Sequence, residues 1–245
     1  NNQTINFCRA SRKDFRNAVQ VSRSEFNKWN SFSGYNRGQI LYRIAEMLDS
    51  RKEQFISELI LQGKSKKSSK QEVEMSIDRL VYYAGWSDKY QQIFSRVNPV
   101  ATPYFNFSYP EPTGVVSIIS PKDSHLLGFI SVIAPAIVGG NTVVVLAPED
   151  NPLCAISFSE VLHSSDVPSG VINILSGLSN ELIDHFSSHM DVNAMIYCGD
   201  NKAHIQMVES NAALNVKHAI IYSNEDWQKE DPYQILKTQE IIAFT

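Results

Sequence analysis

Charged residues follow two of the apolar segments of this sequence and are its first candidates for chemistry. Lys122 and Asp123 come shortly after the apolar run 115–119, and Asp200 follows the apolar run 194–197. A lysine beside an aspartate offers both an acid and a base, the two groups that proton transfer requires. Adjacent side chains on a turn usually point apart, however, so the pattern favours two separate solvated groups.

Histidine and cysteine residues are the next candidates. His185 and His189 are four residues apart, the spacing of two metal ligands on one face of a helix. No third ligand lies nearby, so we expect no zinc site. Cys8, Cys154 and Cys198 are odd in number and widely spaced, which favours a reduced, cytoplasmic compartment over a disulfide framework. We interpret Cys198 as a small apolar residue at the end of a strand.

Short runs rich in β-branched residues alternate with helical patterns through the second half of the chain. The expected strands are 115–119, 142–146, 171–175, 194–197 and 216–222, and the expected helices are 126–138, 153–163, 179–187 and 201–211. This alternation is typical of successive βα units in a parallel sheet. The first two strands are nearly continuous in apolar character, which is expected only where helices cover both faces. The sequence therefore predicts an α/β fold with a doubly wound, Rossmann-like, mostly parallel sheet.

The ligand crevice of such a sheet lies outside the carboxyl ends of its strands. We therefore expect a crevice near Ser120–Asp123, Leu146–Glu149 and Gly199–His204. A last helix is expected to open at Pro232, because proline suits the first helical position, and to reach the end of the chain. The domain that contains the sheet is predicted to span residues 113–245.

Residues 1–97 are predicted to form a helical lead-in. Apolar residues recur at helical spacing within 15–29, 40–60 and 73–84, so each stretch predicts an amphipathic helix packed on the core. The run Lys64–Lys70 is rich in serine and lysine, and we interpret it as a solvated loop between the second and third helices.

Residues 98–112 are expected to form an edge strand. Four aromatic residues crowd into this segment: Tyr104, Phe105, Phe107 and Tyr109. Prolines on both sides of them favour an edge position. An exposed aromatic edge either pairs with a strand of a partner or folds onto its own domain, and the sequence leaves both interpretations open.

Composition excludes several classes of partner. The chain has 245 residues, with 22 basic against 26 acidic side chains. It therefore lacks the excess of positive charge that is typical of proteins that bind nucleic acid. No segment has the ~18 consecutive apolar residues of a membrane span, and no signal peptide opens the sequence. The sequence also lacks an initiator methionine, and we expect it to be a piece of a longer polypeptide.

Several motifs, taken in order, resemble those of the aldehyde dehydrogenases. They lie at 29–46, 78–86, Pro168–Asn173 and Ser188–Asp191, and the resemblance covers about residues 11–222. It implies a helical lead-in, an oligomerisation strand at Tyr104–Tyr109 and a nucleotide-binding domain.

The residues that do chemistry in that family are replaced here. Where the family has Pro-Trp-Asn, whose amide donates to an oxyanion, this sequence has Pro121, Lys122 and Asp123. A carboxylate cannot donate, and the loss of one such donor typically costs about 10²–10³ in rate. Leu146 stands where the family's lysine holds the ribose of the cofactor, whereas Glu149 retains the family's second ribose-facing carboxylate.

The phosphate-binding turn is altered as well. The family's Phe-Thr-Gly-Ser-x-x-x-Gly corresponds to 197–204, which retains Gly199 but has Asp200 and His204 at the other key positions. A carboxylate repels pyrophosphate, and a bulky side chain blocks close approach of the backbone. The family's catalytic glutamate is absent from 216–223, and its cysteine nucleophile would lie beyond residue 245.

These departures predict a non-catalytic module without a cofactor, most similar to the degenerate second unit of aldehyde dehydrogenase family 16. Its expected role is assembly with an active dehydrogenase unit of the same or another chain, in an oligomer. One alternative is a part of an NAD(P)-dependent oxidoreductase acting on aldehydes. A second alternative is a binding module whose cleft, made acidic by Asp123 and Asp200, accepts a cationic ligand.

Overall fold

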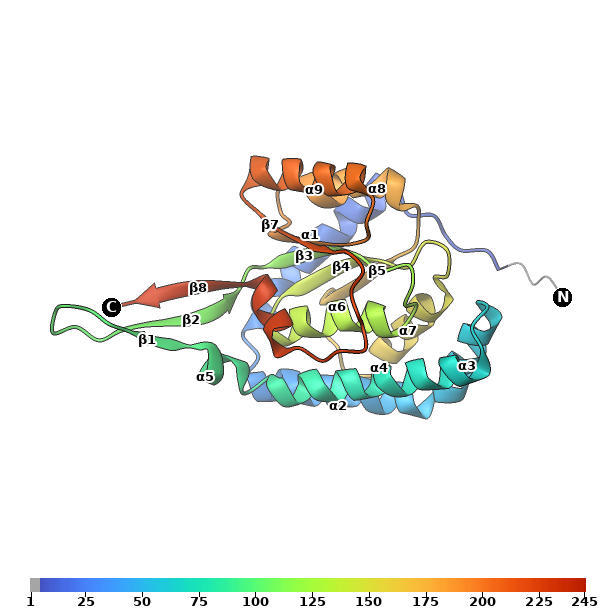
Figure 1. Ribbon diagram of the computed structural model, residues 1–245, viewed down its shortest axis with the longest axis horizontal. Coiled ribbons are helices and arrows are strands. Elements are labelled where there is room, and N and C mark those ends of the chain that lie inside the picture. Colours follow the sequence, from blue (N-terminus) through green and yellow to red (C-terminus); the bar gives the residue numbers. More distant parts are fainter. Residues whose placement is uncertain (1–4) are drawn as a thin grey trace.

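The computed structural model describes residues 5–245 and is organised around a sheet of five parallel strands in the order β5-β4-β3-β6-β7 (Figure 1). The strands are β3 (Val115–Ile119), β4 (Thr142–Leu146), β5 (Ile172–Leu175), β6 (Ala194–Cys198) and β7 (His218–Tyr222). β3 lies in the middle; β4 and β5 extend the sheet to one side, and β6 and β7 extend it to the other. The predicted doubly wound sheet is confirmed, with its switch point between β3 and β6.

Helices cover both faces of this sheet (Figure 1). One face carries α2 (Gly34–Ser50), α3 (Lys52–Leu61), α4 (Lys66–Trp86), α6 (Leu127–Val138) and α7 (Leu153–His163), and the other carries α1 (Arg12–Asn30), α8 (Ser179–Ser188) and α9 (Lys202–Asn215). Every residue of β3, β4, β6 and α6 is buried, which explains why these segments are almost entirely apolar.

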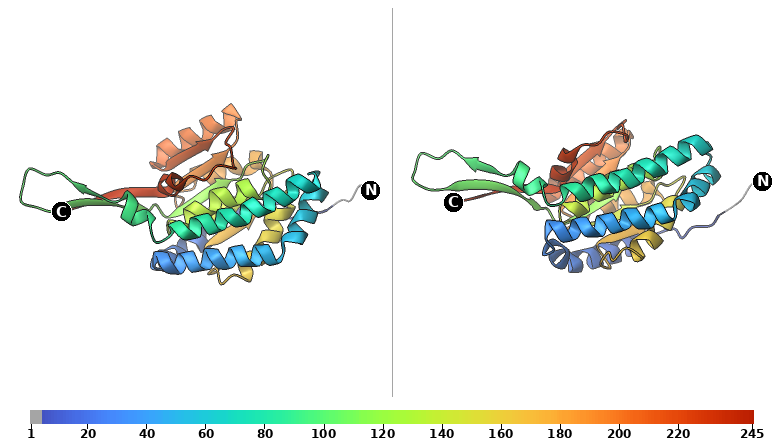
Figure 2. Two further views of the ribbon diagram at one scale, coloured as in Figure 1. Left: turned by 60° about the horizontal axis from the view of Figure 1, so that its bottom comes forward. Right: turned by 90° about the horizontal axis from the view of Figure 1, so that it is seen from below.

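The lead-in helices pack on the sheet domain instead of forming a separate body. α2 and α4 run side by side across one face (Figure 2). Trp29 Nε1 donates to the carbonyl of Ile137 at 3.0 Å, and Arg37 Nε donates to the carbonyl of Val138 at 3.0 Å. These two bonds tie the lead-in to carbonyls in the last turn of α6, where a helix leaves carbonyls without intrahelical partners.

Two details of the lead-in differ from the sequence prediction. The second helix is interrupted at Arg51, which separates α2 from α3. The lysine-rich run is mostly helical, because α4 begins at Lys66, and the Ser65 hydroxyl accepts the Ser68 N–H at 3.2 Å as an N-cap. Ser65 therefore ends the loop after its first two residues.

A second, three-stranded antiparallel sheet projects from the body (Figure 1). The sheet consists of β1 (Arg96–Asn98), β2 (Asn106–Pro112) and β8 (Gln239–Phe244), in the order β1-β2-β8. A short helix, α5 (Tyr90–Phe94), precedes β1. The prediction of an edge strand was wrong: β2 is the central strand, paired on both sides. The predicted last helix was also wrong, because only a 3₁₀ helix, η1 (Pro232–Thr238), precedes β8.

The base of the projecting sheet is fixed to the body. Asn141 Nδ2 donates to the carbonyl of Thr238 at 3.0 Å, and the Thr113 N–H donates to the same carbonyl at 3.2 Å. Gln239 Nε2 donates to the carbonyl of Gly139 at 3.1 Å. Residues 239–244 thus leave the predicted 113–245 domain and belong to the projecting sheet.

None of the helices within residues 5–245 combines the length and the apolar character that crossing a membrane would require.

Candidate functional site

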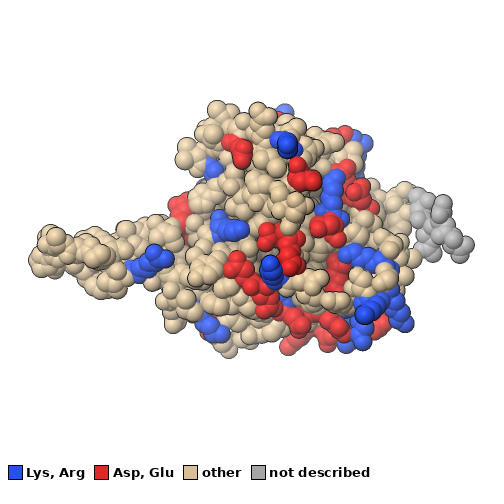
Figure 3. All heavy atoms as spheres, viewed as in Figure 1, with Lys and Arg blue, Asp and Glu red and all other residues tan. Residues whose placement is uncertain are grey.

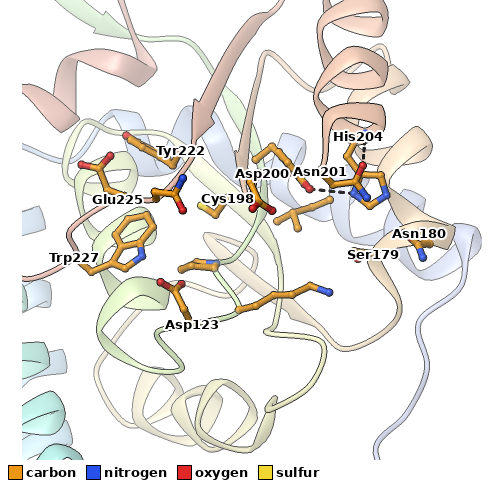
Figure 4. A pocket seen from close by; sticks show the side chains of 16 residues that line it. Asp123, Ser179, Asn180, Cys198, Asp200, Asn201, His204, Tyr222, Glu225 and Trp227 are labelled. Atoms are coloured by element: carbon orange, nitrogen blue, oxygen red, sulfur yellow. Dashed lines mark hydrogen bonds between the residues drawn. The ribbon is translucent and has the colours of Figure 1, made fainter.

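A cavity of about 490 Å³ opens at the switch point of the parallel sheet (Figure 4). Its walls come from the segments that follow β3, β6 and β7 and from the start of α8. This is the edge at which doubly wound sheets bind ligands, so the cavity is the candidate functional site.

The cavity brings together most of the residues that the sequence places in the crevice. Those that line it are Pro121, Lys122, Asp123, Gly199, Asp200 and His204. Ser120 lies beneath it, buried, with its hydroxyl donating to the carbonyl of Leu146 at 2.5 Å. Leu146 does not line the cavity: its side chain is 1% exposed and belongs to the apolar core against α1 and α8.

The turn between β6 and α9 closes the amino end of α9 with its own side chain. Asn201 Oδ1 accepts the backbone N–H of Ala203 at 3.0 Å and that of His204 at 3.4 Å. These N–H groups are the free donors that make a helix amino end attractive to phosphate. Here they already have an acceptor from the protein, an arrangement typical of an N-cap asparagine.

Glu149 is engaged by the protein as well. Its Oε2 accepts the backbone N–H of Ser179 at 3.0 Å and the Ser179 hydroxyl at 2.5 Å, at the start of α8. Lys122 Nζ lies 3.4 Å from the same oxygen. Burial alone would raise the pKa of Glu149, but the hydrogen bonds from Ser179 together with Lys122 lower it below its ordinary value. Glu149 therefore caps α8 as a carboxylate.

Unpaired negative charge dominates the rest of the cavity. Within residues 5–245, Asp123, Asp200 and Glu225 line the cavity and have neither an ion pair nor a side-chain hydrogen bond with the protein. A second cavity of about 270 Å³ adjoins it and shares Asp123, Glu225 and Trp227. In the view of Figure 3, acidic side chains gather on the body, while the projecting sheet is nearly free of charge.

Cys198 also lines the cavity but is poorly suited to nucleophilic chemistry. Its side chain is 5% exposed, and burial raises the pKa of its thiol well above the ordinary value, with Asp123 and Glu225 adding to the effect. The thiolate is the reactive form of cysteine, so this environment suppresses reactivity.

Sequence reasoning missed the contribution of the segment after β7. Glu225 and Trp227 enter both cavities because buried Arg79 of α4 holds this segment: its guanidinium donates to the carbonyl of Trp227 at 2.9 Å and to the Ser131 hydroxyl at 2.5 Å. A tryptophan in an otherwise polar stretch directly after a strand was the available signal. The position of Arg79 could not be read from local sequence.

The two histidines at helical spacing lie away from the crevice. No group of three or more histidine, cysteine or acidic side chains in the described part of the chain is arranged to hold a metal ion. His185 and His189 instead line a groove between α1 and α8, at the opposite edge of the sheet from the crevice.

The doubly wound parallel sheet and its crevice define a Rossmann-like class of fold. The family model that matches is the aldehyde dehydrogenase family, over residues 1–221. The chain therefore belongs to the aldehyde dehydrogenase family, which confirms the resemblance inferred from its motifs.

Relatives and solved structures agree with this assignment. The cytosolic aldehyde dehydrogenase 1 of Elephantulus edwardii is 30% identical over 217 residues, which are 86% of this chain and 43% of that protein. The cytosolic 10-formyltetrahydrofolate dehydrogenase of Pongo abelii is 31% identical over 83% of this chain, but over only 23% of its own length.

A betaine aldehyde dehydrogenase from Staphylococcus aureus, solved in complex with NAD⁺, superposes with a TM-score of 0.81 at 26% identity. The match covers 87% of this chain and 42% of that one. The chain thus spans less than half the length of the structure and of the two dehydrogenases it resembles.

Proposed function

We propose that this chain is a non-catalytic aldehyde-dehydrogenase-like module that leaves its ancestral cofactor crevice empty and serves assembly of a larger protein of the family. The observation that carries the proposal is the cap on α9, where Asn201 occupies the backbone donors of Ala203 and His204. A dinucleotide would have to displace that cap to place its pyrophosphate on the helix.

The energetic argument favours an empty crevice. Loss of an N-cap interaction costs about 1 kcal/mol. A phosphate charge at roughly 5 Å from the Asp200 carboxylate adds repulsion of about 1–3 kcal/mol at effective dielectric constants between those of water and a protein surface. Together the two effects weaken binding by about 30- to 1,000-fold. Retention of Gly199 and Glu149 does not offset this loss, because Glu149 already caps α8.

The role in assembly rests on the two faces of the projecting sheet. The register places Val97, Phe107 and Phe244 side by side, and Phe107 also stacks on Tyr109 with ring centroids 6.2 Å apart. The opposite face is polar at its outer end, where Asn98 Nδ2 donates to Asn106 Oδ1 at 2.6 Å, and carries the exposed Ile241 nearer the body. An apolar face on a sheet that projects into solvent is a surface that suits a protein partner. An active dehydrogenase unit, in the same or another chain, is the partner we propose.

Calorimetric titration with NAD⁺ and NADP⁺ tests the empty crevice. We expect no saturable heat from the natural chain, and weak binding regained by a variant with Asp200→Ser, Asn201→Gly and His204→Gly. Glu209→Gly, elsewhere on α9, controls for the helix destabilisation of about 1 kcal/mol that His204→Gly introduces. Micromolar binding by the natural chain would contradict the proposal and favour the alternative, a part of an NAD(P)-dependent oxidoreductase.

A cationic ligand of the crevice is a second candidate function, favoured by the three unpaired carboxylates of Asp123, Asp200 and Glu225 beside the Trp227 ring. Carboxylates with an aromatic face suit an organic cation. Quenching of Trp227 fluorescence by a quaternary ammonium compound, lost in Glu225→Gln, would support this function. Absence of quenching at millimolar concentration would exclude it.

A further inference from the structure

We propose that a basic groove between α1 and α8, distant from the crevice, binds a small ligand that carries phosphate groups. The groove lies beside the segments that lead into β6 and β7, at the amino edge of the sheet, whereas the crevice lies at the carboxyl edge. The proposal does not depend on whether the crevice is empty.

The groove consists of two adjoining cavities, of about 490 and 290 Å³. α1 contributes Arg12, Arg16 and Arg23, whose spacing of four and seven residues places them along one face of the helix. The end of α8 and the turn after it contribute His185 and His189. Arg16 and His189 line both cavities and therefore mark the place where they meet.

The positive charge of this groove is not compensated by the protein. Within residues 5–245, Arg12 and Arg16 form no ion pair, and Arg23 donates only to the neutral side-chain oxygen of Asn193, at 3.1 Å. The one carboxylate among the lining residues is that of Asp191. An anion would therefore find several guanidinium groups free to donate.

Lys217 adds a buried cation beneath the groove. The residue is 8% exposed, and its Nζ donates to the backbone carbonyl of His189 at 2.8 Å. An ammonium group has three donors, and no carboxylate is paired with this one in the described part of the chain. A buried charge without a counter-ion is costly, so an anion bound at the neighbouring groove would stabilise it.

His189 supplies a further donor. Its Nδ1 accepts the backbone N–H of Asp191 at 3.2 Å, so in the neutral ring the proton sits on Nε2. The ring packs edge-on against Phe15, with centroids 5.8 Å apart, which fixes its orientation. Burial lowers the pKa of His189, and Lys217 and Arg16 lower it further, against the opposing effect of Asp191. A bound anion would reverse part of that shift.

Phosphate matches these donors better than a carboxylate does. Guanidinium groups bind phosphate oxygens in bidentate fashion, and each phosphate offers several acceptors. Two cavities that meet at Arg16 and His189 suit a ligand with two anionic groups, such as a diphosphate.

Calorimetric titration of the whole chain with inorganic pyrophosphate at pH 7 tests the proposal. We expect saturable binding that weakens about tenfold in Arg16→Gln, the loss of one charge-assisted contact. Lys28→Gln, on the same helix but paired with Glu25, and Lys122→Gln, in the crevice, are controls expected to change affinity less than twofold. Arg12→Gln, at an exposed position that cannot affect folding strongly, should weaken binding as Arg16→Gln does.

A pH series separates specific binding from general attraction. Sulfate keeps its charge between pH 6 and 8, so a higher affinity for sulfate at pH 6 than at pH 8, reduced in His189→Gln, is the expected result. Arg12, Arg16, Arg23, His185, Lys217 and Asp191 are the other charged or titratable groups that face the site. Absence of saturable heat with pyrophosphate, or equal weakening by Arg16→Gln and Lys28→Gln, would overturn the proposal.

Discussion

The phenol oxygen of Tyr197 lies 3.1 Å from Nδ1 of His204, and this contact spans the turn between β6 and α9. The same contact accounts for a glycine at position 199. A Cβ at position 199 would lie 2.8 Å from the Tyr197 hydroxyl oxygen. Gly199 is thus required by the packing of Tyr197, whether or not a ligand approaches the backbone.

Gly199→Ala is therefore expected to lower the free energy of unfolding by about 1–3 kcal/mol, the usual cost of overpacking a filled site. Gly85→Ala is the matched control, because a Cβ there meets no atom closer than 3.7 Å and the residue lies within α4. Alanine at that helical position should stabilise by about 0.5–1 kcal/mol. Urea denaturation of both variants measures the difference, and equal stabilities would contradict this account of Gly199.

Removal of the Arg79 guanidinium should loosen the segment that completes the crevice. Arg79→Met leaves the carbonyls of Trp227 and Gln228 without their donor, and we expect a loss of about 2–4 kcal/mol in unfolding free energy. Hydrogen exchange within 223–231 should rise at the same time. Arg43→Met, which removes an exposed pair with Glu46, should change stability by less than about 0.5 kcal/mol. Unchanged exchange in 223–231 would show that Arg79 does not hold the segment.

Lys217 should leave a signature in the alkaline stability of the protein. Burial lowers the pKa of Lys217 from the ordinary 10.5 to about 8. Between these two pH values Lys217 has lost its proton in the folded chain but keeps it in the unfolded chain. The unfolded state therefore binds more protons, and the free energy of unfolding rises with pH in this range. Urea unfolding at pH 7.5 and 9.5 should therefore show the natural chain gaining stability relative to Lys217→Met.

That comparison isolates Lys217, because every other titratable group is common to both chains. A constant stability difference between the two chains over this pH range would mean that the lysine keeps its proton when folded.

The apolar face of the projecting sheet should control association. Phe105 is 66% exposed and packs on Phe107 with centroids 5.6 Å apart, so Phe105→Glu places a charge on that face with little effect on folding. In sedimentation velocity we expect the variant to form smaller species than the natural chain does, either alone or mixed with an active dehydrogenase unit. Ala243→Glu, exposed on the other face, is the control. Identical sedimentation of all three chains would remove this sheet from the interface.

The parallel sheet could be predicted because each βα unit is encoded locally. Runs such as 115–119 and 142–146 are almost entirely apolar, and the observed strands match them to the residue. β8 could not be predicted in the same way, since its partner β2 lies far away in sequence. Pro232 does begin a helix, but this is the short 3₁₀ helix η1. The residues after η1 form hydrogen bonds with β2 instead of continuing a helix.

The site was predicted in part for the same reason. Asp123 and Asp200 come within four residues of the ends of β3 and β6, so the sheet brings both to the crevice. Leu146 is also at a strand end, but its side chain faces the core. A strand buried on both faces shows no alternation of polar and apolar residues, so the sequence does not reveal to which face Leu146 points. The Asn201 cap could have been recognised, because asparagine before a helical run is a standard start signal.

The pairing of β2 with β8 also sets an order of events during synthesis. The paired residues are about 130 positions apart, so β2 leaves the ribosome long before its partner strand exists. At a rate of about 5–20 residues per second, β2 waits for about 7–26 s with one edge unpaired. Over that interval the nascent chain exposes an aggregation-prone strand, and a chaperone that shields extended aromatic segments would raise its yield.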